Sequence, residues 1–306
     1  MKILFFTDVH LVGKSNINRK DNLVETQIDK LKELVEESKS TDLALSCGDI
    51  FHKYDPSIST MKTFSNFIEE LECPLVLCPG NHDLHGYNYN SIHNTGMGYI
   101  CSFFKDKVHL MNEDMEVYEF TPKNKDMTLS IHFKRTIDKD PMVDFKVDKN
   151  STYNIGIIHD MVFNQNFFGT ATEYKNFDTN LDVLFNGHIH HGHNPLLLNG
   201  TWFINPGSVS RMHKPNPYFD ARYVVLSLGK YAVNSFKEIE VTQKIFKTSR
   251  EDVFNTHEKK EFSNFINKIE SQKIETNAIE YMFNFANEKL SSNALQLLKN
   301  IYEKVV

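Results

Sequence analysis

Five short apolar segments constrain what this chain can fold into more than any other feature of its sequence. Each is rich in Ile, Leu, Val or Phe and ends in polar residues that can bind a metal or a proton. The segments are residues 2–10, 42–49, 73–83, 153–160 and 181–190. Near-continuous apolar runs of this length are typical of strands that are buried on both faces. The pattern therefore predicts a sheet whose strands all end in chemically capable side chains.

Amphipathic helices separate the first three of these segments. The first helix carries four aliphatic side chains on one face, Val24, Ile28, Leu31 and Val35. The second is entered through Pro56-Ser57, with Ser57 as its N-cap. Alternating strands and helices predict an α/β layered fold, in which ligands bind outside the carboxyl ends of the strands. We therefore expect all five polar ends to converge on one rim.

Two further regions, residues 107–149 and 195–247, contain short strand-like pieces broken by turn residues, with a hairpin turn at Asn199-Gly200. We expect them to flank the central sheet as a second β layer, which makes the fold a layered β-sheet sandwich flanked by helices. After about residue 250 the sequence becomes helical and amphipathic. The predicted organisation is a catalytic domain at 1–215, a small accessory β region at 216–249 and a C-terminal helical segment at 250–306.

Composition excludes several classes of protein. With 40% hydrophobic and 24% charged residues in 306, the chain is expected to fold and is not of the disordered type. It has no apolar run of about 18 residues, so no membrane-spanning helix is expected, and its start lacks a signal-peptide cleavage site. Four sparse cysteines fit a reduced, cytoplasmic location. The net charge of -6 does not decide the substrate, because two bound divalent cations would add about +4 locally.

The polar residues at the strand ends indicate a chemical function only when they are considered together. They are Asp8-x-His10, Gly48-Asp49, Gly80-Asn81-His82-Asp83, His159 and Gly187-His188-x-His190. Mixed oxygen and imidazole donors suit borderline divalent ions such as Mn, Fe or Zn and disfavour calcium, which prefers oxygen ligands alone. A pair of such ions about 3.5 to 4 Å apart can activate a water and hold a phosphate for in-line attack.

The order D-x-H, G-D, G-N-H-D, H, G-H-x-H across residues 8–190 resembles that of the calcineurin-like metallophosphoesterases. The resemblance implies two divalent metal ions, one held by Asp8, His10, Asp49 and His190. The other would be held by Asp49, Asn81, His159 and His188, with Asp49 bridging. His82 would not be a ligand and would act on the scissile phosphate as general acid.

A narrower resemblance rests on Gly48-Asp49-Ile50-Phe51-His52, followed by Asp55-Pro56-Ser57. This block is similar to the G-D-[LI]-F-H-x-x-x-P-S segment of SbcD-type nucleases, whose partner in double-strand-break repair is an SMC-type ATPase. It implies a DNA exonuclease and endonuclease that prefers manganese, with His52 handling the DNA backbone near the metals. The expected partners are DNA and an SbcC-like ATPase docked by residues 250–306. Whether the chain forms a homodimer is left open. The short chain suggests a compact phage-type version, which would work in the host cytoplasm.

The sequence leaves alternatives open for the substrate contacts and for the function of the protein. Tyr87 is a candidate for stacking on a base, with packing of its own loop as the other interpretation. Arg211 follows Asn205-Pro206-Gly207-Ser208, which resembles a turn found in nucleases and small phosphodiesterases of this superfamily alike, and is a candidate substrate contact. His193 is expected at the rim of the site. The alternative functions are a small-molecule or cyclic-nucleotide phosphodiesterase and a non-catalytic DNA-binding scaffold that docks an ATPase.

Overall fold

The computed structural model describes residues 1–15, 19, 21–123, 126–135, 145, 147–164, 172–176, 179–212, 220–229 and 237–247. All of them belong to the unit Met1–Val253. The predicted C-terminal helical segment, residues 250–306, lies outside the described residues. Within the described ranges, no helix combines the length and the apolar character needed to cross a membrane.

The described strands form two six-stranded sheets and one small two-stranded pair. The first sheet has the order β14-β13-β1-β2-β3-β4. Its strands are β1 (Lys2–Phe6), β2 (Leu43–Ser46), β3 (Leu75–Leu77), β4 (Val108–Leu110), β13 (Arg222–Leu228) and β14 (Ile239–Ile245). The second has the order β11-β12-β10-β7-β6-β5. Its strands are β5 (Val117–Phe120), β6 (Leu129–Phe133), β7 (Tyr153–Ile158), β10 (Val183–Asn186), β11 (Leu196–Leu198) and β12 (Thr201–Ile204). The pair is β8 (Val162–Phe163) with β9 (Thr172–Glu173).

Each large sheet has a parallel centre. Strands β1 to β4 are mutually parallel, β13 pairs antiparallel with β1, and β14 pairs antiparallel with β13 at the edge of the sheet. In the second sheet β12, β10, β7 and β6 are parallel, while β11 and β5 run antiparallel at the edges. The β11–β12 hairpin turns at Asn199 and Gly200, whose φ angles of 50° and 87° are the positive values that such a tight turn needs. That turn was predicted from the sequence and is confirmed.

Three α-helices are described, and each begins with a side-chain cap. They are α1 (Leu23–Ser38), α2 (Ile58–Glu70) and α3 (Gly96–Phe103). Ser57 accepts a hydrogen bond from the Thr60 N–H at 3.3 Å, which confirms its predicted role as the N-cap of α2. Four 3₁₀-helices complete the described elements: η1 (Asn81–Asp83), η2 (His85–Tyr87), η3 (Tyr89–Asn94) and η4 (Tyr174–Asn176).

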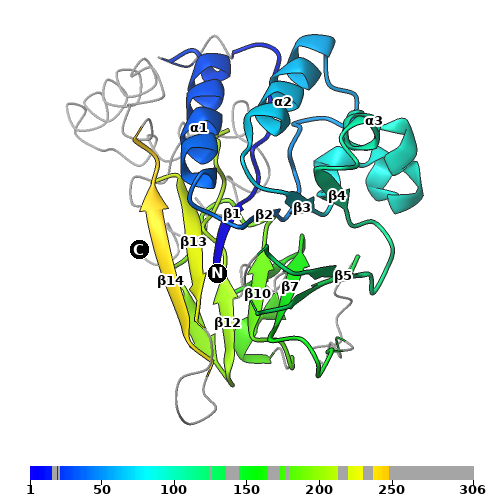
Figure 1. Ribbon diagram of the computed structural model, residues 1–306. Helices are drawn as coiled ribbons and strands as arrows, with labels where there is room; N and C mark the ends of the chain where they lie inside the picture. The colour runs from blue at the N-terminus through cyan, green and yellow to red at the C-terminus, as the bar shows by residue number, and fades with distance from the viewer. Residues whose placement is uncertain are drawn as a thin grey trace, which may run out of the picture. The chain divides into compact units, whose positions relative to one another are not determined.

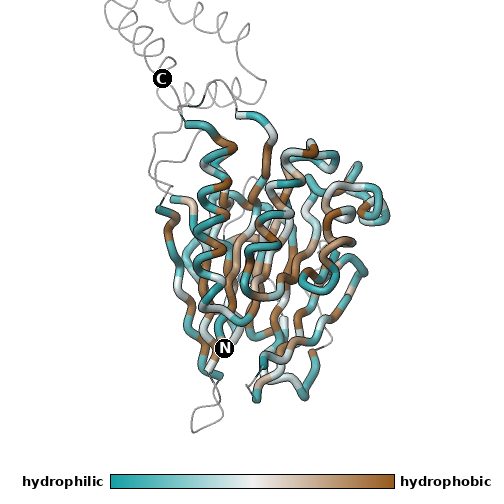
Figure 2. Tube along the Cα trace, turned by 45° about the horizontal axis from the view of Figure 1, so that its top comes forward, coloured by the Kyte–Doolittle hydropathy of each residue, from teal (hydrophilic) through white to brown (hydrophobic). Residues whose placement is uncertain are grey.

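The central strands of the first sheet are buried on both faces, by helices on one side and by the second sheet on the other (Figure 1). Alternate residues of β1 show this division. Leu4 and Phe6 belong to the core beneath the helices, whereas Phe5 packs toward the second sheet, where its ring stacks on Phe185 at 4.0 Å between centroids. Figure 2 shows the same arrangement, with apolar strands inside and hydrophilic stretches along the helices. This explains why β1 to β3 are near-continuous apolar runs.

The predicted α/β layered architecture is confirmed, but the strands are distributed differently from the expectation. The five chemically capable strands do not share one sheet, because β1, β2 and β3 lie in the first and β7 and β10 in the second. Residues 107–149 and 195–247 contribute to both sheets, and β13, from the range 216–249, pairs directly with β1. A strand's apolar pattern records that both faces are covered. It does not record whether a helix or a second sheet covers them.

Candidate metal centre

Every predicted metal ligand lies just beyond the carboxyl end of a parallel strand. Asp8 and His10 follow β1, Asp49 follows β2 and Asn81 follows β3 at the start of η1. His159 follows β7, and His188 and His190 follow β10. The ends of both sheets meet at one rim, so residues far apart in the sequence become neighbours. The predicted convergence of the five polar ends is therefore observed, across two sheets instead of one.

The first ligand group consists of Asp8, His10, Asp49 and His190, with one potential ligand atom of each within 4.8 Å of the others. The Nε2 atoms of His10 and His190 lie 2.9 Å apart. Nε2 of His10 is 3.5 Å from Asp49 Oδ2, and Nε2 of His190 is 3.5 Å from Asp8 Oδ1. Two imidazole nitrogens this close, flanked by carboxylates, require a proton or a cation between them, so the donor set fits a divalent ion.

The second group consists of Asp49, His159 and His188, again within 4.8 Å of one another. Oδ2 of Asp49 is 3.3 Å from His159 Nε2. The amide oxygen of Asn81 lies 3.1 Å from His159 Nε2 and 2.9 Å from His188 Nδ1, so it joins the same cluster. Asp49 belongs to both ligand groups, which is the position that a bridging carboxylate needs.

Four of these residues have a backbone conformation that is uncommon outside glycine. The φ angles of Asp8, His10, Asp49 and His188 are 53°, 47°, 50° and 71°. Asp and His tolerate this left-handed region better than most residues, at a cost of about 1 to 3 kcal/mol each. Gly48 allows the close approach of the neighbouring turn, because a Cβ there would lie 2.2 Å from the backbone nitrogen of Gly80. The strand-end turns are thus strained and held by one another.

The electrostatics of the cluster favour the binding of positive charge. Burial alone would raise the pKa of Asp8 and Asp49, but the hydrogen bond with His190 at Asp8 and the charge of His159 near Asp49 hold both pKa values below their usual range. Burial lowers the pKa of His159, yet the Asp49 carboxylate outweighs it and raises the pKa to about 10. Burial also lowers the pKa of His10 to about 3. Two buried carboxylates with imidazoles beside them match the needs of divalent cations.

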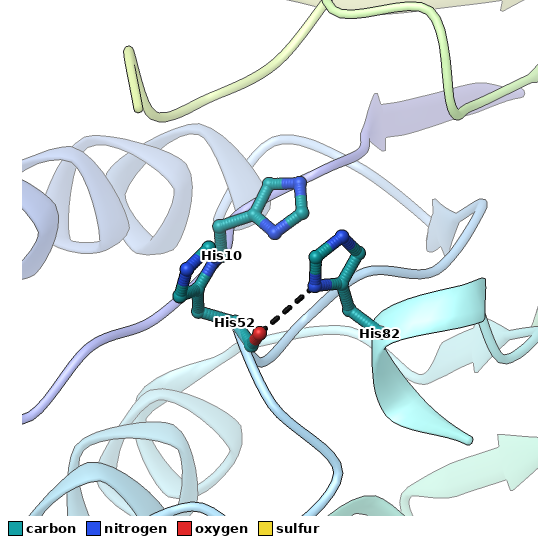
Figure 3. Close-up of side chains that lie close together, drawn as sticks. All are labelled: His10, His52 and His82. Carbon is teal, nitrogen blue, oxygen red and sulfur yellow. Dashed lines mark hydrogen bonds between the residues drawn. The ribbon is translucent and has the colours of Figure 1, made fainter. Parts of the chain in front are cut away.

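The rings of His52 and His82 lie close to that of the ligand His10, with one nitrogen of each within 4.8 Å of the others (Figure 3). Nδ1 of His82 donates a hydrogen bond to the backbone oxygen of His52 at 2.9 Å. The rings of His52 and His82 stack at 5.3 Å with 20° between their planes, and His10 meets His82 edge-on at 4.9 Å. Because Nδ1 is tied to a carbonyl, Nε2 is the nitrogen of His82 that is able to exchange a proton with a bound molecule.

Besides His52, the two other candidate substrate residues differ in setting. Tyr87, at the end of η2, is 73% exposed and has a φ of 60°. Arg211 is partly buried, and its Nη2 donates to Asp220 Oδ1 at 3.1 Å. The expectation for His193 was wrong, because this residue is buried and its Nε2 lies 3.1 Å from the Tyr174 hydroxyl. Its apolar surroundings were not recognisable from its place after G-H-x-H.

Two supporting residues were not recognised from the sequence. The Thr7 hydroxyl donates to Asp8 Oδ2 at 2.8 Å and orients that carboxylate. Asp83, the last residue of G-N-H-D, accepts hydrogen bonds from the backbone N–H groups of Phe51 and Gly80, both at 3.0 Å. It therefore ties two strand-end turns together, and burial and the nearby Asp49 raise its pKa to about 7. Its place in the motif was a signal of importance, but only the fold shows that it binds backbone.

The fold and the converging donor set define a metal-dependent hydrolase of phosphoesters. A family model for the calcineurin-like phosphoesterases matches residues 1–225. The match spans most of the chain, so this protein belongs to the calcineurin-like phosphoesterase family. Comparison with curated protein sequences finds no match.

Several solved structures resemble this chain at low identity. One is a purple acid phosphatase, PPD1, from yellow lupin (Lupinus luteus) seeds, 14% identical with a TM-score of 0.48 over 83% of this chain and 52% of that one. This chain thus spans about half of the lupin protein. A second is TT1561 of Thermus thermophilus, 11% identical with a TM-score of 0.43 over 74% of this chain and 93% of that one. A third is Vps29 of Chaetomium thermophilum, 10% identical with a TM-score of 0.36 over 80% and 97%.

Proposed function

We propose that this protein is a two-metal-dependent DNA exonuclease and endonuclease, the nuclease subunit of an SbcCD-like repair and recombination complex. The observation that supports it best is the place of His52, the residue that separates the G-D-I-F-H block from other phosphoesterase motifs. His52 lies against His82 through both its carbonyl and its ring. A second histidine beside the general acid suits a substrate with phosphates on either side of the scissile bond.

The chain's own residues have distinct roles in this proposal. Asp8, His10, Asp49 and His190 would hold one cation, and Asp49, Asn81, His159 and His188 the other. When bound, such a pair supplies charge that activates water and neutralises the phosphate. His82 gives a proton from Nε2 to the leaving 3′ or 5′ oxygen, while the His52 carbonyl keeps its ring oriented. His52, Tyr87 and Arg211 are the proposed contacts to the DNA.

Manganese is the proposed metal because the resemblance to SbcD-type nucleases implies it, and the mixture of carboxylate, amide and imidazole donors suits it as it suits iron or zinc. The proposed partners beyond DNA are an SbcC-like SMC-type ATPase, docked by residues 250–306, and a second copy of the chain. These partners are carried by the sequence resemblance alone.

The proposal is tested with purified protein and MnCl2 on three substrates: linear duplex DNA, circular single-stranded DNA and bis-p-nitrophenyl phosphate. A nuclease cleaves both DNAs, and cleavage stops with EDTA. Hydrolysis of the small diester without cleavage of either DNA would instead identify a small-molecule phosphodiesterase. DNA binding with no hydrolysis of any substrate would identify a scaffold subunit. A His52→Ala variant separates the roles further, since it should lose DNA cleavage more than diester hydrolysis.

A further inference from the structure

Gln27 is a polar side chain that the proposed chemistry does not use, yet it is buried beside the metal centre. It lies in α1 and is only 1% exposed. Burying an amide costs free energy unless its hydrogen-bonding groups are satisfied. The bonds of this amide therefore indicate what it does.

The amide joins two segments that are far apart in the sequence. Its Nε2 donates to the backbone oxygens of His10 at 2.8 Å and Val9 at 3.2 Å, and to Ser210 Oγ at 2.9 Å. Its Oε1 accepts from the backbone N–H of Val12 at 3.1 Å. Val9 and His10 lie within the Asp8-x-His10 motif, and Ser210 directly precedes Arg211.

The motif needs this support because of its backbone geometry. Asp8 and His10 both have positive φ angles, 53° and 47°. The backbone N–H of His10 donates to the backbone oxygen of Asp49 at 2.8 Å. The backbone oxygens of Val9 and His10, in contrast, accept from the Gln27 amide. Without the amide, buried carbonyls would lose their donor, and the strained turn would lose what opposes its relaxation.

The segment on the other side of the amide is tied to the same motif. The Ser208 hydroxyl donates to the backbone oxygen of Asp8 at 2.7 Å, and the Val209 N–H donates to the backbone oxygen of Thr7 at 3.1 Å. Gln27 thus links the Asp8-x-His10 motif to residues 208–210, which form further hydrogen bonds with Thr7 and Asp8.

We propose that Gln27 is a positioning residue that holds Asp8 and His10 in their metal-binding geometry. The proposal rests on the proposed two-metal function, in which Asp8 and His10 are ligands. Loss of the amide weakens cation binding at the first ligand group, as expected when the groups that orient metal ligands are removed.

The test is calorimetric titration of the metal-free protein with MnCl2, comparing the wild type with Gln27→Met, which removes the amide and keeps the size. Lys30→Met is the matched control, because Lys30 is one turn further along α1, is 3% exposed and donates to the backbone oxygen of Val209 at 2.6 Å, whereas the Val9 and His10 oxygens accept from Gln27. Circular dichroism confirms that each variant is folded at the temperature used. Gln27→Met should bind Mn²⁺ about 10- to 100-fold more weakly, whereas Lys30→Met should bind it like the wild type.

Equal Mn²⁺ affinity in Gln27→Met and the wild type would overturn the proposal, and so would an equal loss in Lys30→Met. If Gln27→Met does not fold, Gln27→Asn replaces it, since its amide is one methylene shorter and loses the reach to the Val9 and His10 oxygens without adding charge, and the same outcomes decide. A wild type that binds Mn²⁺ and cleaves no DNA would refute the nuclease function while the comparison of affinities still decides the role of Gln27. A wild type that binds no divalent cation would overturn both.

Discussion

Replacing His82 by alanine should slow hydrolysis of DNA by about 10² to 10⁴, the usual range for loss of a general acid. That range corresponds to about 3 to 5 kcal/mol of transition-state stabilisation. The metals should stay bound, because the contact of His82 with Asp49 is made by its backbone N–H, at 2.8 Å, which the substitution keeps. The lost bond to the His52 oxygen should cost about 1 kcal/mol of unfolding free energy, too little to unfold the protein.

The assay compares two leaving groups. Rates are measured with Mn²⁺ on DNA and on bis-p-nitrophenyl phosphate, whose nitrophenolate leaves without being protonated, and metal content is determined on the same samples. His85→Ala is the matched control, since His85 is an exposed histidine of the neighbouring η2 whose ring packs on Tyr54 at 4.8 Å. His82→Ala should lose much more activity on DNA than on the nitrophenyl diester. Equal losses on both substrates, or loss of a metal ion, would refute the general-acid role.

Three further predictions concern the Asp49 carboxylate, the buried Lys30 and the C-terminal segment. Asp49→Asn should lose both metal ions, measured by elemental analysis, and all turnover. The reason is that the Asp49 carboxylate lies 3.5 Å from Nε2 of His10 and 3.3 Å from Nε2 of His159, one residue of each ligand group. A variant that keeps two metal ions and normal rates would disprove the bridging role. Burial and the nearby Arg211 lower the pKa of Lys30 to about 7 from 10.5, so the unfolded chain binds the extra proton between these values, and the contribution of Lys30 to stability rises with pH there by at most about 5 kcal/mol. The raised pKa of His159 acts in the opposite direction over the same range, so the contribution is measured as a difference between two proteins. From about pH 7 to about pH 9.5, urea unfolding should show the wild type gaining stability relative to Lys30→Met, and equal changes in the two proteins would contradict the shift. Deleting residues 251–306 should leave hydrolysis of a small diester largely unchanged and abolish co-purification with an SbcC-like ATPase, whereas an insoluble product would assign the segment to the fold.

Much of the candidate site was predictable because each ligand directly follows an apolar run. A parallel strand ends at the same edge as its neighbours, so Asp8 and Asp49, which follow the adjacent strands β1 and β2, could be expected to meet from their positions alone. His159 follows a strand of the second sheet and joins them only through the packing of the two sheets. The caps and the hairpin turn were predictable for a similar reason. Ser57 and Asn199-Gly200 act through bonds to residues only a few positions away, and such local chemistry is written in the sequence.

The parts that were not predicted depend on contacts between distant residues. Asp83 has the same chemistry as Asp49, yet it binds the N–H groups of Phe51 and Gly80 because two turns approach each other there. Gln27 is one polar residue among several on an amphipathic helix, and only its packing against the Asp8-x-His10 turn distinguishes it.

The sequence by itself determined the layered α/β class, the order of the metal-binding motifs and the residue types of the donor set, since these depend on hydrophobic pattern and on side-chain chemistry. Only the tertiary structure decided that the five strands are divided between two sheets and that Asp49 belongs to both ligand groups. It also decided that His52 lies against His82. The physical reason is that an apolar run specifies burial without naming the surface that buries it, whereas hydrogen-bond distances between side chains depend on how whole layers pack.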